Sequence, residues 1–147
     1  MQTVGPKIYL VSCVSQKRKQ ACAAQDLYVS NLFRKARRYA EESGCSWFIL
    51  SAESGLVAPR KVIAPYERTL NKMRVADRRA WGEKVAAQLI KAVPNLAEVV
   101  FLAGKRYREF LTPHLESRDV NVSVPMEGRR IGEQLSWLDR HSPKSTE

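Results

Sequence analysis

Two short hydrophobic runs of this sequence each lead directly into polar side chains that could bind a ligand. Both runs are typical of buried β-strands, and a polar loop after a strand is where α/β proteins place their ligands. The second loop contains glycine, and further along it Pro65 precedes Tyr66. We therefore expect the two loops to converge on one crevice. The polar residues concerned are Ser12, Cys13 and Lys17 after the first run, and Ser51, Glu53 and Gly55 after the second.

A third loop of this kind has the sequence Gly104, Lys105 and Arg106, at the point where a strand gives way to a helix. Backbone amides at a helix start, together with two cations, suit a phosphate group. Tyr107 follows, and Tyr66 and Tyr107 are rings that could flank a flat ligand. The sequence has neither a Gly-x4-Gly-Lys-Ser/Thr nor a Gly-x-Gly-x-x-Gly pattern, so ATP and NAD are unsupported and no cofactor is expected.

Four carboxylates, Asp26, Glu53, Glu67 and Glu127, could lie near the same edge. Beside an aromatic ring and phosphate-binding cations, a carboxylate could orient water for hydrolysis of the glycosidic bond of an extruded nucleotide. Glu53 and Asp26 are the catalytic candidates. Asp26 also fits a helix N-cap, Glu53 also fits plain loop charge, and Tyr66 also fits a packing anchor. These alternatives stay open.

The cysteines and histidines do not indicate a metal site. There are three cysteines and two histidines, and their spacing matches no zinc pattern. Cys13 follows a strand and could be a nucleophile, but a buried small residue fits better, since no histidine lies near it in the sequence. We therefore expect no metal and no disulfide framework.

The charge of the chain is strongly one-sided, with 25 Lys and Arg against 15 Asp and Glu and a net charge of +10. Such a balance favours polyanionic partners, although it also fits a solvated basic surface. Several basic clusters follow predicted strands, so we expect nucleic acid as the partner, with DNA ahead of RNA. The clusters include residues 17–19, 34–38, 60–61, 68–79, 105–108 and 129–130.

Length and composition indicate one globular domain. The 147 residues suit a single core, and 44% of them are hydrophobic, too many for a disordered chain. No run approaches the ~20 apolar residues that span a bilayer. Residues 1–7 lack the apolar stretch of a secretory signal, so we expect a cytoplasmic protein with no membrane partner. The domain is predicted to cover residues 1–141, with a polar tail at 142–147.

Strands and helices alternate along the chain. Apolar runs predict four strands, and helical spacing of apolar residues predicts four helices. Crossovers too long for hairpins imply a mainly parallel sheet, whose strand carboxyl ends share one edge. The expected fold is α/β, with a four-stranded sheet and helices on both faces in a three-layer sandwich. The predicted strands are 8–12, 46–51, 98–103 and 120–124, and the predicted helices start near Asp26, Ala76, Lys105 and Arg130.

Several short motifs in one order resemble the YaaA-like family, whose founding member is a bacterial peroxide-stress protein that binds DNA. The resemblance spans about residues 7 to 140. One departure concerns residues 53 and 54, where the family pattern has Lys and an aromatic residue or His and this chain has Glu and Ser. The matching residues are Ser12, Cys13 and Lys17, Asp26, Tyr28, Ser30 and Phe33, Leu50–Ala52, Gly55 and Leu56, Pro65, Tyr66 and Leu70, and Ile131, Gly132 and Leu135.

The resemblance implies handling of nucleic acid or of modified bases. Relatives of the group are similar in fold to uracil-DNA glycosylases, and a related domain occurs in archaeal tRNA-modification enzymes. The expected function is therefore nucleic-acid binding in DNA repair or stress response, with N-glycosylase activity on a damaged or modified base as the enzymatic interpretation. The alternatives are a non-catalytic DNA-binding protein and an enzyme that acts on a small nucleoside or nucleotide.

Overall fold

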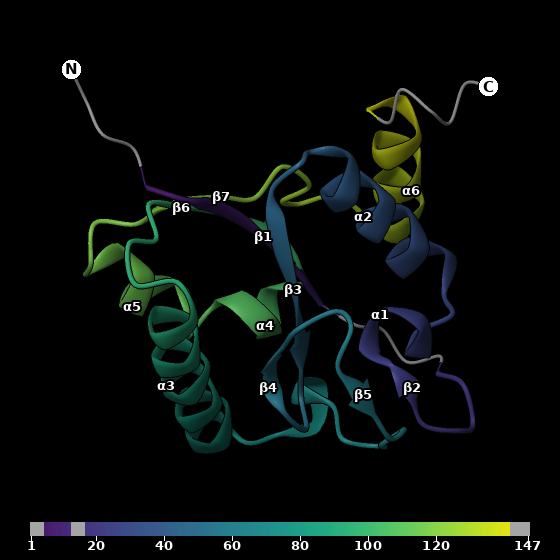
Figure 1. Cartoon of the computed structure of the whole chain (residues 1–147), viewed down its shortest axis with the longest axis horizontal. Coiled ribbons are helices and arrows are strands. Elements are labelled where there is room, and N and C mark those ends of the chain that lie inside the picture. Colours follow the sequence, from purple (N-terminus) through teal and green to yellow (C-terminus); the bar gives the residue numbers. More distant parts are fainter. Residues whose placement is uncertain (1–4, 13–16, 142–147) are drawn as a thin grey trace.

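The structure is a computed structural model that describes residues 5–12 and 17–141. Its middle layer is a five-stranded sheet with strand order β4-β3-β1-β6-β7 (Figure 1). β1, β3, β6 and β7 are parallel, as predicted, and β4 pairs with β3 in the antiparallel sense. The strands are β1 (Lys7–Ser12), β3 (Ser46–Ser51), β4 (Gly55–Val57), β6 (Glu98–Leu102) and β7 (Asn121–Ser123).

The fifth strand, β4, is a difference from the predicted four-stranded sheet. Ser51 at the end of β3 pairs with Gly55 at the start of β4, so three residues connect the two strands. Gly55 has a φ of +79°, a backbone conformation that glycine adopts at little cost and that closes short hairpin loops. The polar loop predicted after Ser51 is therefore a β-hairpin turn, and β4 is too short to show a hydrophobic pattern of its own.

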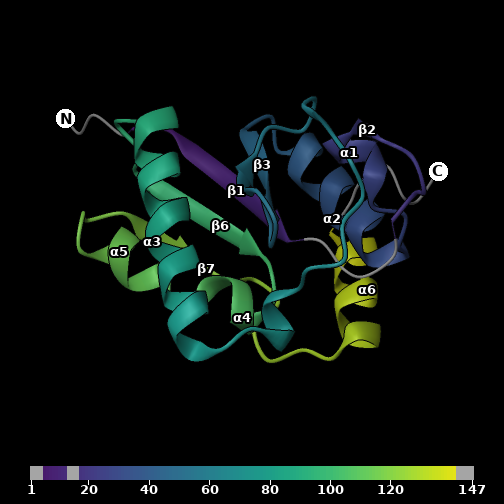
Figure 2. The ribbon, with the colours of Figure 1, turned by 90° about the horizontal axis from the view of Figure 1, so that it is seen from below.

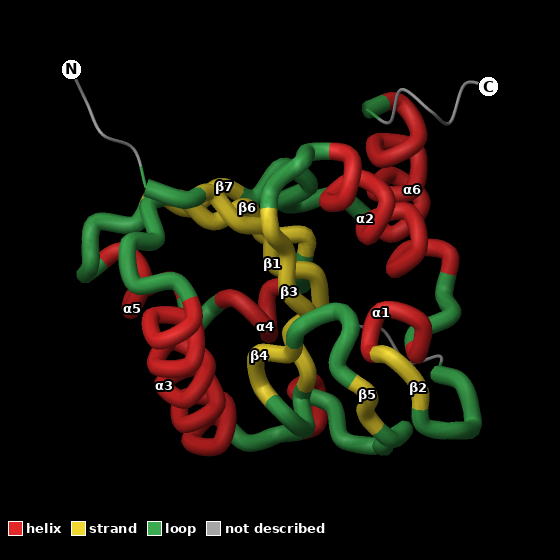
Figure 3. The backbone as a smooth tube through the Cα atoms, viewed as in Figure 1, coloured by secondary structure: helices red, strands yellow, loops and turns green. Residues whose placement is uncertain are grey.

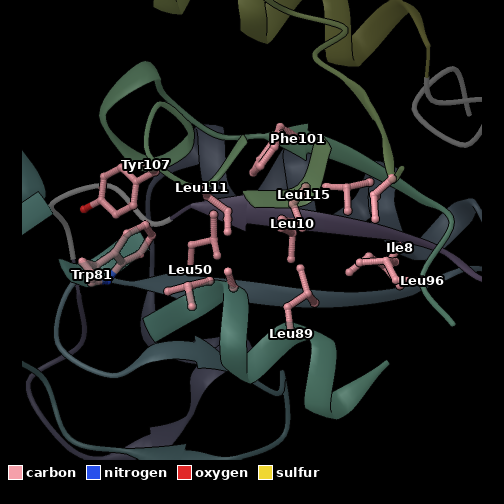
Figure 4. Close-up of a cluster of buried hydrophobic side chains, with 14 of the residues drawn as sticks. Ile8, Leu10, Leu50, Trp81, Leu89, Leu96, Phe101, Tyr107, Leu111 and Leu115 are labelled. Atoms are coloured by element: carbon pink, nitrogen blue, oxygen red, sulfur yellow. The ribbon is translucent and has the colours of Figure 1, made fainter. Parts of the chain in front are cut away.

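Helices cover both faces of the sheet, which confirms the three-layer arrangement (Figure 2). Side chains of a strand alternate between the two faces, so Tyr9 and Val11 of β1 pack toward α2 and α6, whereas Ile8 and Leu10 pack toward α3 and its neighbours. Figure 4 shows the second of these cores, with Leu10 and Phe101 from the sheet facing Leu89 of α3. The helices are α2 (Asn31–Glu42) and α6 (Ile131–Arg140) on one face, and α3 (Val75–Ala92), α4 (Lys105–Arg108) and α5 (Thr112–Glu116) on the other.

Gly82 on α3 lies against the backbone of Phe110. A Cβ atom built at Gly82 would lie 2.7 Å from the carbonyl oxygen of Phe110, and backbone cannot move aside as a flexible side chain can. We expect Gly82→Ala to lower the free energy of unfolding by ~1–3 kcal/mol, as overpacked cores do. Chemical denaturation measures it. Gly132→Ala on α6 is the matched control, because nothing lies within 4 Å of the added Cβ, and an equal loss in both variants would contradict the packing argument.

The first helix does not begin at Asp26, so its predicted role as an N-cap is wrong. Asp26 lies inside a one-turn helix, α1 (Ala24–Leu27), after which Tyr28 is extended and pairs with Lys17 in an isolated bridge. The long helix α2 starts only after Ser30, whose hydroxyl accepts a hydrogen bond from the backbone N–H of Phe33 at 3.1 Å. The bridge at Tyr28 therefore separates α1 from α2, although the helical spacing of apolar residues continues through this position in the sequence.

Residues 53–73, which lie between the second predicted strand and the helix predicted from Ala76, contain several short elements (Figure 3). Besides β4 these are β5 (Val62–Ile63), which pairs with β2 (Cys22–Ala23) in a separate two-stranded sheet, and the 3-10 helix η1 (Leu70–Lys72). Leu70 is fully buried and anchors η1 in the core.

The last two predicted helices also differ in detail. The helix expected from Lys105 is divided into α4 and α5, with Pro113 in the first turn of α5, where its missing N–H is tolerated. On α6, the apolar side chain of Ile131 is 61% exposed, and the buried side chains are Trp137 and Leu138. None of the helices in residues 5–12 and 17–141 combines the length and the apolar character that crossing a membrane requires. The predicted tail at 142–147 lies outside the described residues.

Candidate functional site

The carboxyl ends of the parallel strands lie at one edge of the sheet, as predicted. Ser12 of β1 pairs with Leu50 near the end of β3, and Val11 pairs with Leu102 at the end of β6. The loops that leave these strands lead to α4, η1 and the starts of α3 and α6, all on the same side of the molecule (Figure 2). Ser12 is half-buried at this edge, and Cys13 lies outside the described residues.

Ser51 and Gly55 lie at the two ends of the hairpin turn, and both are buried. The Ser51 hydroxyl accepts hydrogen bonds from the backbone N–H groups of Glu53 at 3.2 Å and Ser54 at 3.0 Å, and the residue is fully buried. Its carbonyl oxygen accepts a hydrogen bond from Trp81 Nε1 at 2.9 Å. Gly55 is buried against the side chain of Gln88. In this conformation Ser51 and Gly55, both predicted binding residues, stabilise the turn, and a ligand would contact neighbouring residues of the loop.

Lys17 and Tyr66 meet at the carboxyl edge in a cluster with Tyr28. The Lys17 ammonium lies 4.5 Å from the ring centre of Tyr66 and 5.9 Å from that of Tyr28, within the range of cation–π attraction. The two tyrosine hydroxyls are hydrogen-bonded at 2.7 Å. Tyr66 is half-buried and packs against both cores, so it acts as a packing anchor. Sequence reasoning missed Tyr28, because only the bridge to Lys17 brings it here.

The hydroxyl of Tyr66 gives a test of this cluster. Tyr66→Phe keeps the ring beneath Lys17 and removes the hydrogen bond to Tyr28, so we expect the free energy of unfolding to fall by ~1 kcal/mol. Urea denaturation measures this change. Tyr66→Ala also removes the packed ring and should cost several times more. Equal stability of the two variants would mean that the ring contributes nothing to the core.

A hollow of about 450 Å³ opens beside this edge, between the ends of β6 and β7. We call it the β6–β7 hollow. Phe101, Ala103, Val124 and Met126 supply apolar lining, so its floor is hydrophobic while its rim is charged. The other lining residues are Gly104, Lys105, Arg108, Glu127, Gly128, Arg129 and Gln134. Of the predicted binding residues, Gly104 and Lys105 lie in this lining.

Some of the charged side chains around the β6–β7 hollow have ion-pair partners and others do not. Arg108 is held in place, because its Nε donates to the carbonyl oxygen of Ala103 at 3.1 Å and its guanidinium lies 3.7 Å from the Glu127 carboxylate. Lys105 and Arg129 are exposed and make no ion pair with any other residue in the described part of the chain. The hollow therefore presents two cations to a ligand. Sequence reasoning placed Glu127 near this edge and included Arg108 and Arg129 in basic clusters, but it did not note Gln134, which only the fold places here.

The remaining predicted residues after β6 are separate from the hollow. Tyr107 is 7% exposed and packs edge-on against Trp81 at a ring distance of 5.7 Å, so it is part of the core (Figure 4). Arg106 is exposed outside the lining and lies 3.7 Å from Glu109. α4 has only four residues, so it offers one turn of aligned peptides, and the phosphate-binding potential of this loop depends on its side chains.

The two catalytic candidates are both exposed and paired with arginines. Asp26 lies 3.1 Å from Arg37 on α2, and Glu53 lies 3.6 Å from Arg68. Burial alone would lower the pKa of Arg37, but hydrogen bonds and charge attraction to Glu41 and Asp26 outweigh it, so this pKa is raised and the guanidinium stays charged. Neither Asp26 nor Glu53 lines the β6–β7 hollow. The ion pair between Asp26 and Arg37 connects α1 to α2, whereas Glu53 lies on the turn directly after β3.

Exposed cations continue from the hollow onto η1 and α3. Arg78 of α3 is 7% exposed and joins these elements, because it donates to the carbonyl oxygen of Met73 at 2.6 Å and to Glu109 at 3.1 Å. Glu109 in turn contacts Arg106. This network holds the start of α3, the end of η1 and α4 together. We define the carboxyl-edge surface as the exposed cations Lys72, Arg74, Lys105, Arg106 and Arg129.

Comparison with known proteins gives a family but no activity. No curated protein matches the chain. A crystal structure described as AF0587, a protein of unknown function, is 16% identical with a TM-score of 0.49, and the match covers 93% of this chain and 44% of that one. This chain therefore spans less than half of that protein's length, and a likeness of this degree carries no functional argument. Residues 8–140 match a family of unknown function, so the chain belongs to the family DUF6884.

Proposed function

We propose that this protein binds nucleic acid through the carboxyl-edge surface, with the phosphate backbone as the main contact. The observation that carries the proposal is the gathering of five exposed cations at one edge of the sheet. Among them, only Arg106 has a carboxylate partner in the described part of the chain, and that partner, Glu109, is shared with Arg78. Cations without such partners can neutralise phosphates and release the counterions that surround a nucleic acid.

Two further features support the proposal. The net charge of +10 favours a polyanionic partner. The resemblance to the YaaA-like family points the same way, toward DNA ahead of RNA and toward a role in repair or stress response. A cytoplasmic location belongs to the same proposal. Because both candidate carboxylates are exposed and paired with arginines, the geometry favours binding more strongly than it favours chemistry.

Base excision is the enzymatic form of the proposal, and it depends on Glu53. This carboxylate lies on the loop after β3, whereas Asp26 is held between α1 and α2 by Arg37. Glu53→Gln keeps the shape and removes the charge. Modified-base oligonucleotides incubated with the protein should then give abasic sites with the wild type and lose them with Glu53→Gln, while binding stays equal or improves because a negative charge near phosphates is gone. Excision that is unchanged in this variant would exclude Glu53 as the catalytic group.

The binding proposal is tested by fluorescence anisotropy with labelled single- and double-stranded oligonucleotides of several sequences. We expect binding at low salt with little sequence preference, and a linear fall of log K with log salt concentration, because the contacts are to phosphates. Undetectable binding at low salt, or an affinity that does not change between low and physiological salt, would overturn the proposal.

A further inference from the structure

We infer that the β6–β7 hollow binds a single nucleoside monophosphate unit, with its phosphate between Lys105 and Arg129 and its base over the apolar floor. The part of the inference that concerns a nucleic-acid strand rests on the proposed function, whereas binding of the free nucleotide is tested independently of it. The nucleotide in the hollow could be a free nucleotide or one nucleotide of a strand that lies on the carboxyl-edge surface.

The hollow has the size and the lining of a small-molecule site. Its volume of about 450 Å³ lies within the ~300–1,000 Å³ of ligand pockets. Met126 is 7% exposed and, with Ala103 and Val124, forms an apolar wall that a base can cover. A purely phosphate-binding patch on a basic surface would not need such a wall. The combination of an apolar floor and a cationic rim suits a ligand that has one flat apolar part and one anionic part.

The rim supplies the anion-binding groups. Lys105 is the first residue of α4 and Arg129 lies before α6, so two separate segments contribute one cation each to the same hollow. Neither cation makes an ion pair within residues 5–12 and 17–141. Arginine and lysine bind phosphate by charge-assisted hydrogen bonds, which are roughly twice as strong as neutral ones. A phosphate between them would satisfy both charges.

The hollow also contains polar groups that are already oriented. Arg108 is fixed by Ala103 and Glu127, and Gln134 Nε2 donates to the carbonyl oxygen of Arg129 at 2.9 Å. That hydrogen bond leaves the Gln134 side-chain oxygen without a donor from the described residues. Guanidinium and amide groups of this kind hydrogen-bond to the edges of bases. Because Arg108 and Gln134 are held by backbone carbonyl groups, little reorganisation is required on binding.

The test measures binding of AMP and CMP by isothermal titration calorimetry, with adenosine and inorganic phosphate as the two partial ligands. We expect both nucleotides to bind more tightly than either partial ligand, because only the nucleotides contact floor and rim together. Arg129→Gln and Lys105→Gln should each weaken AMP binding about tenfold, the loss expected for one charge-assisted hydrogen bond. Lys91→Gln and Arg118→Gln are matched controls, since both are exposed cations near the opposite edge of the sheet and should leave AMP binding unchanged.

The outcomes separate this inference from the proposed function. If AMP binds no more tightly than inorganic phosphate, or if Arg129→Gln and Lys105→Gln bind AMP like the wild type while remaining folded by circular dichroism, the inference is overturned, whether or not oligonucleotides bind. If AMP binds as expected and competes with a labelled oligonucleotide, the hollow holds a nucleotide of the strand. If AMP binds as expected but oligonucleotides do not bind at low salt, the hollow is a site for free nucleotides and the proposed function fails.

Discussion

Replacing Trp81 with alanine is expected to lower the free energy of unfolding by ~3–5 kcal/mol, the range for loss of a large buried aromatic side chain. Trp81 is 7% exposed and connects three elements (Figure 4). Its Nε1 donates to the carbonyl oxygen of Ser51 at the end of β3, and its ring packs against Tyr107 of α4. The substitution therefore removes hydrophobic burial and also leaves the Ser51 carbonyl oxygen without its indole donor.

Urea denaturation of the two-state transition measures this loss. Trp81→Phe separates its two causes, because phenylalanine keeps most of the apolar burial and lacks the indole N–H. We expect this variant to lose roughly 1–3 kcal/mol, the range for an unsatisfied buried acceptor. A change below ~1 kcal/mol in Trp81→Ala would contradict the assignment of this residue to the core.

The second large effect concerns two cations of the carboxyl-edge surface that lie outside the β6–β7 hollow, Arg74 and Arg106. Each phosphate contact gives a slope of about −0.9 in log K against log salt, so at ~0.1 M salt one lost contact weakens binding roughly tenfold. The double variant Arg74→Gln/Arg106→Gln should therefore bind duplex DNA roughly one hundredfold more weakly than the wild type. Fluorescence anisotropy at fixed salt measures the ratio.

Folding must be unchanged for this comparison to be meaningful. Both side chains are exposed, and Glu109 keeps its contact with the buried Arg78 when Arg106 is neutralised. We therefore expect the melting temperature of the double variant to remain close to that of the wild type. An affinity within threefold of the wild type would remove the carboxyl-edge surface from the binding site.

The central parallel strands β1, β3 and β6 could be predicted from the sequence because each is a short apolar run with consecutive buried residues. Parallel pairing then placed their ends at one edge, and that expectation is confirmed. β4 could not be predicted, since its three residues follow a polar turn and pair only because Gly55 adopts a positive φ. The start of α2 was misplaced because the bridge between Lys17 and Tyr28, a contact between separate segments, interrupts a regular apolar spacing.

The candidate site was predicted in part for similar reasons. Gly104 and Lys105 were recognised because they follow a strand directly, and they do line the hollow. Ser51 followed a strand as well, but its hydroxyl is occupied by the backbone of its own turn, which only coordinates can show. Arg108 was part of a basic cluster recognised after the third predicted strand, whereas Gln134 lies 26 positions further along the chain, so no local pattern could indicate that both line the same hollow.

The measurement that tests the central claim most directly is the salt dependence of duplex binding for two double variants of equal charge. Arg74→Gln/Arg106→Gln removes two cations from the carboxyl-edge surface, and Lys91→Gln/Arg118→Gln removes two from the opposite edge. We predict that the slope of log K against log salt becomes less negative by about 1.8 in the first variant and stays at the wild-type value in the second. Equal slopes in the two variants would contradict the claim, because binding would then depend on overall charge and not on the edge where the parallel strands end.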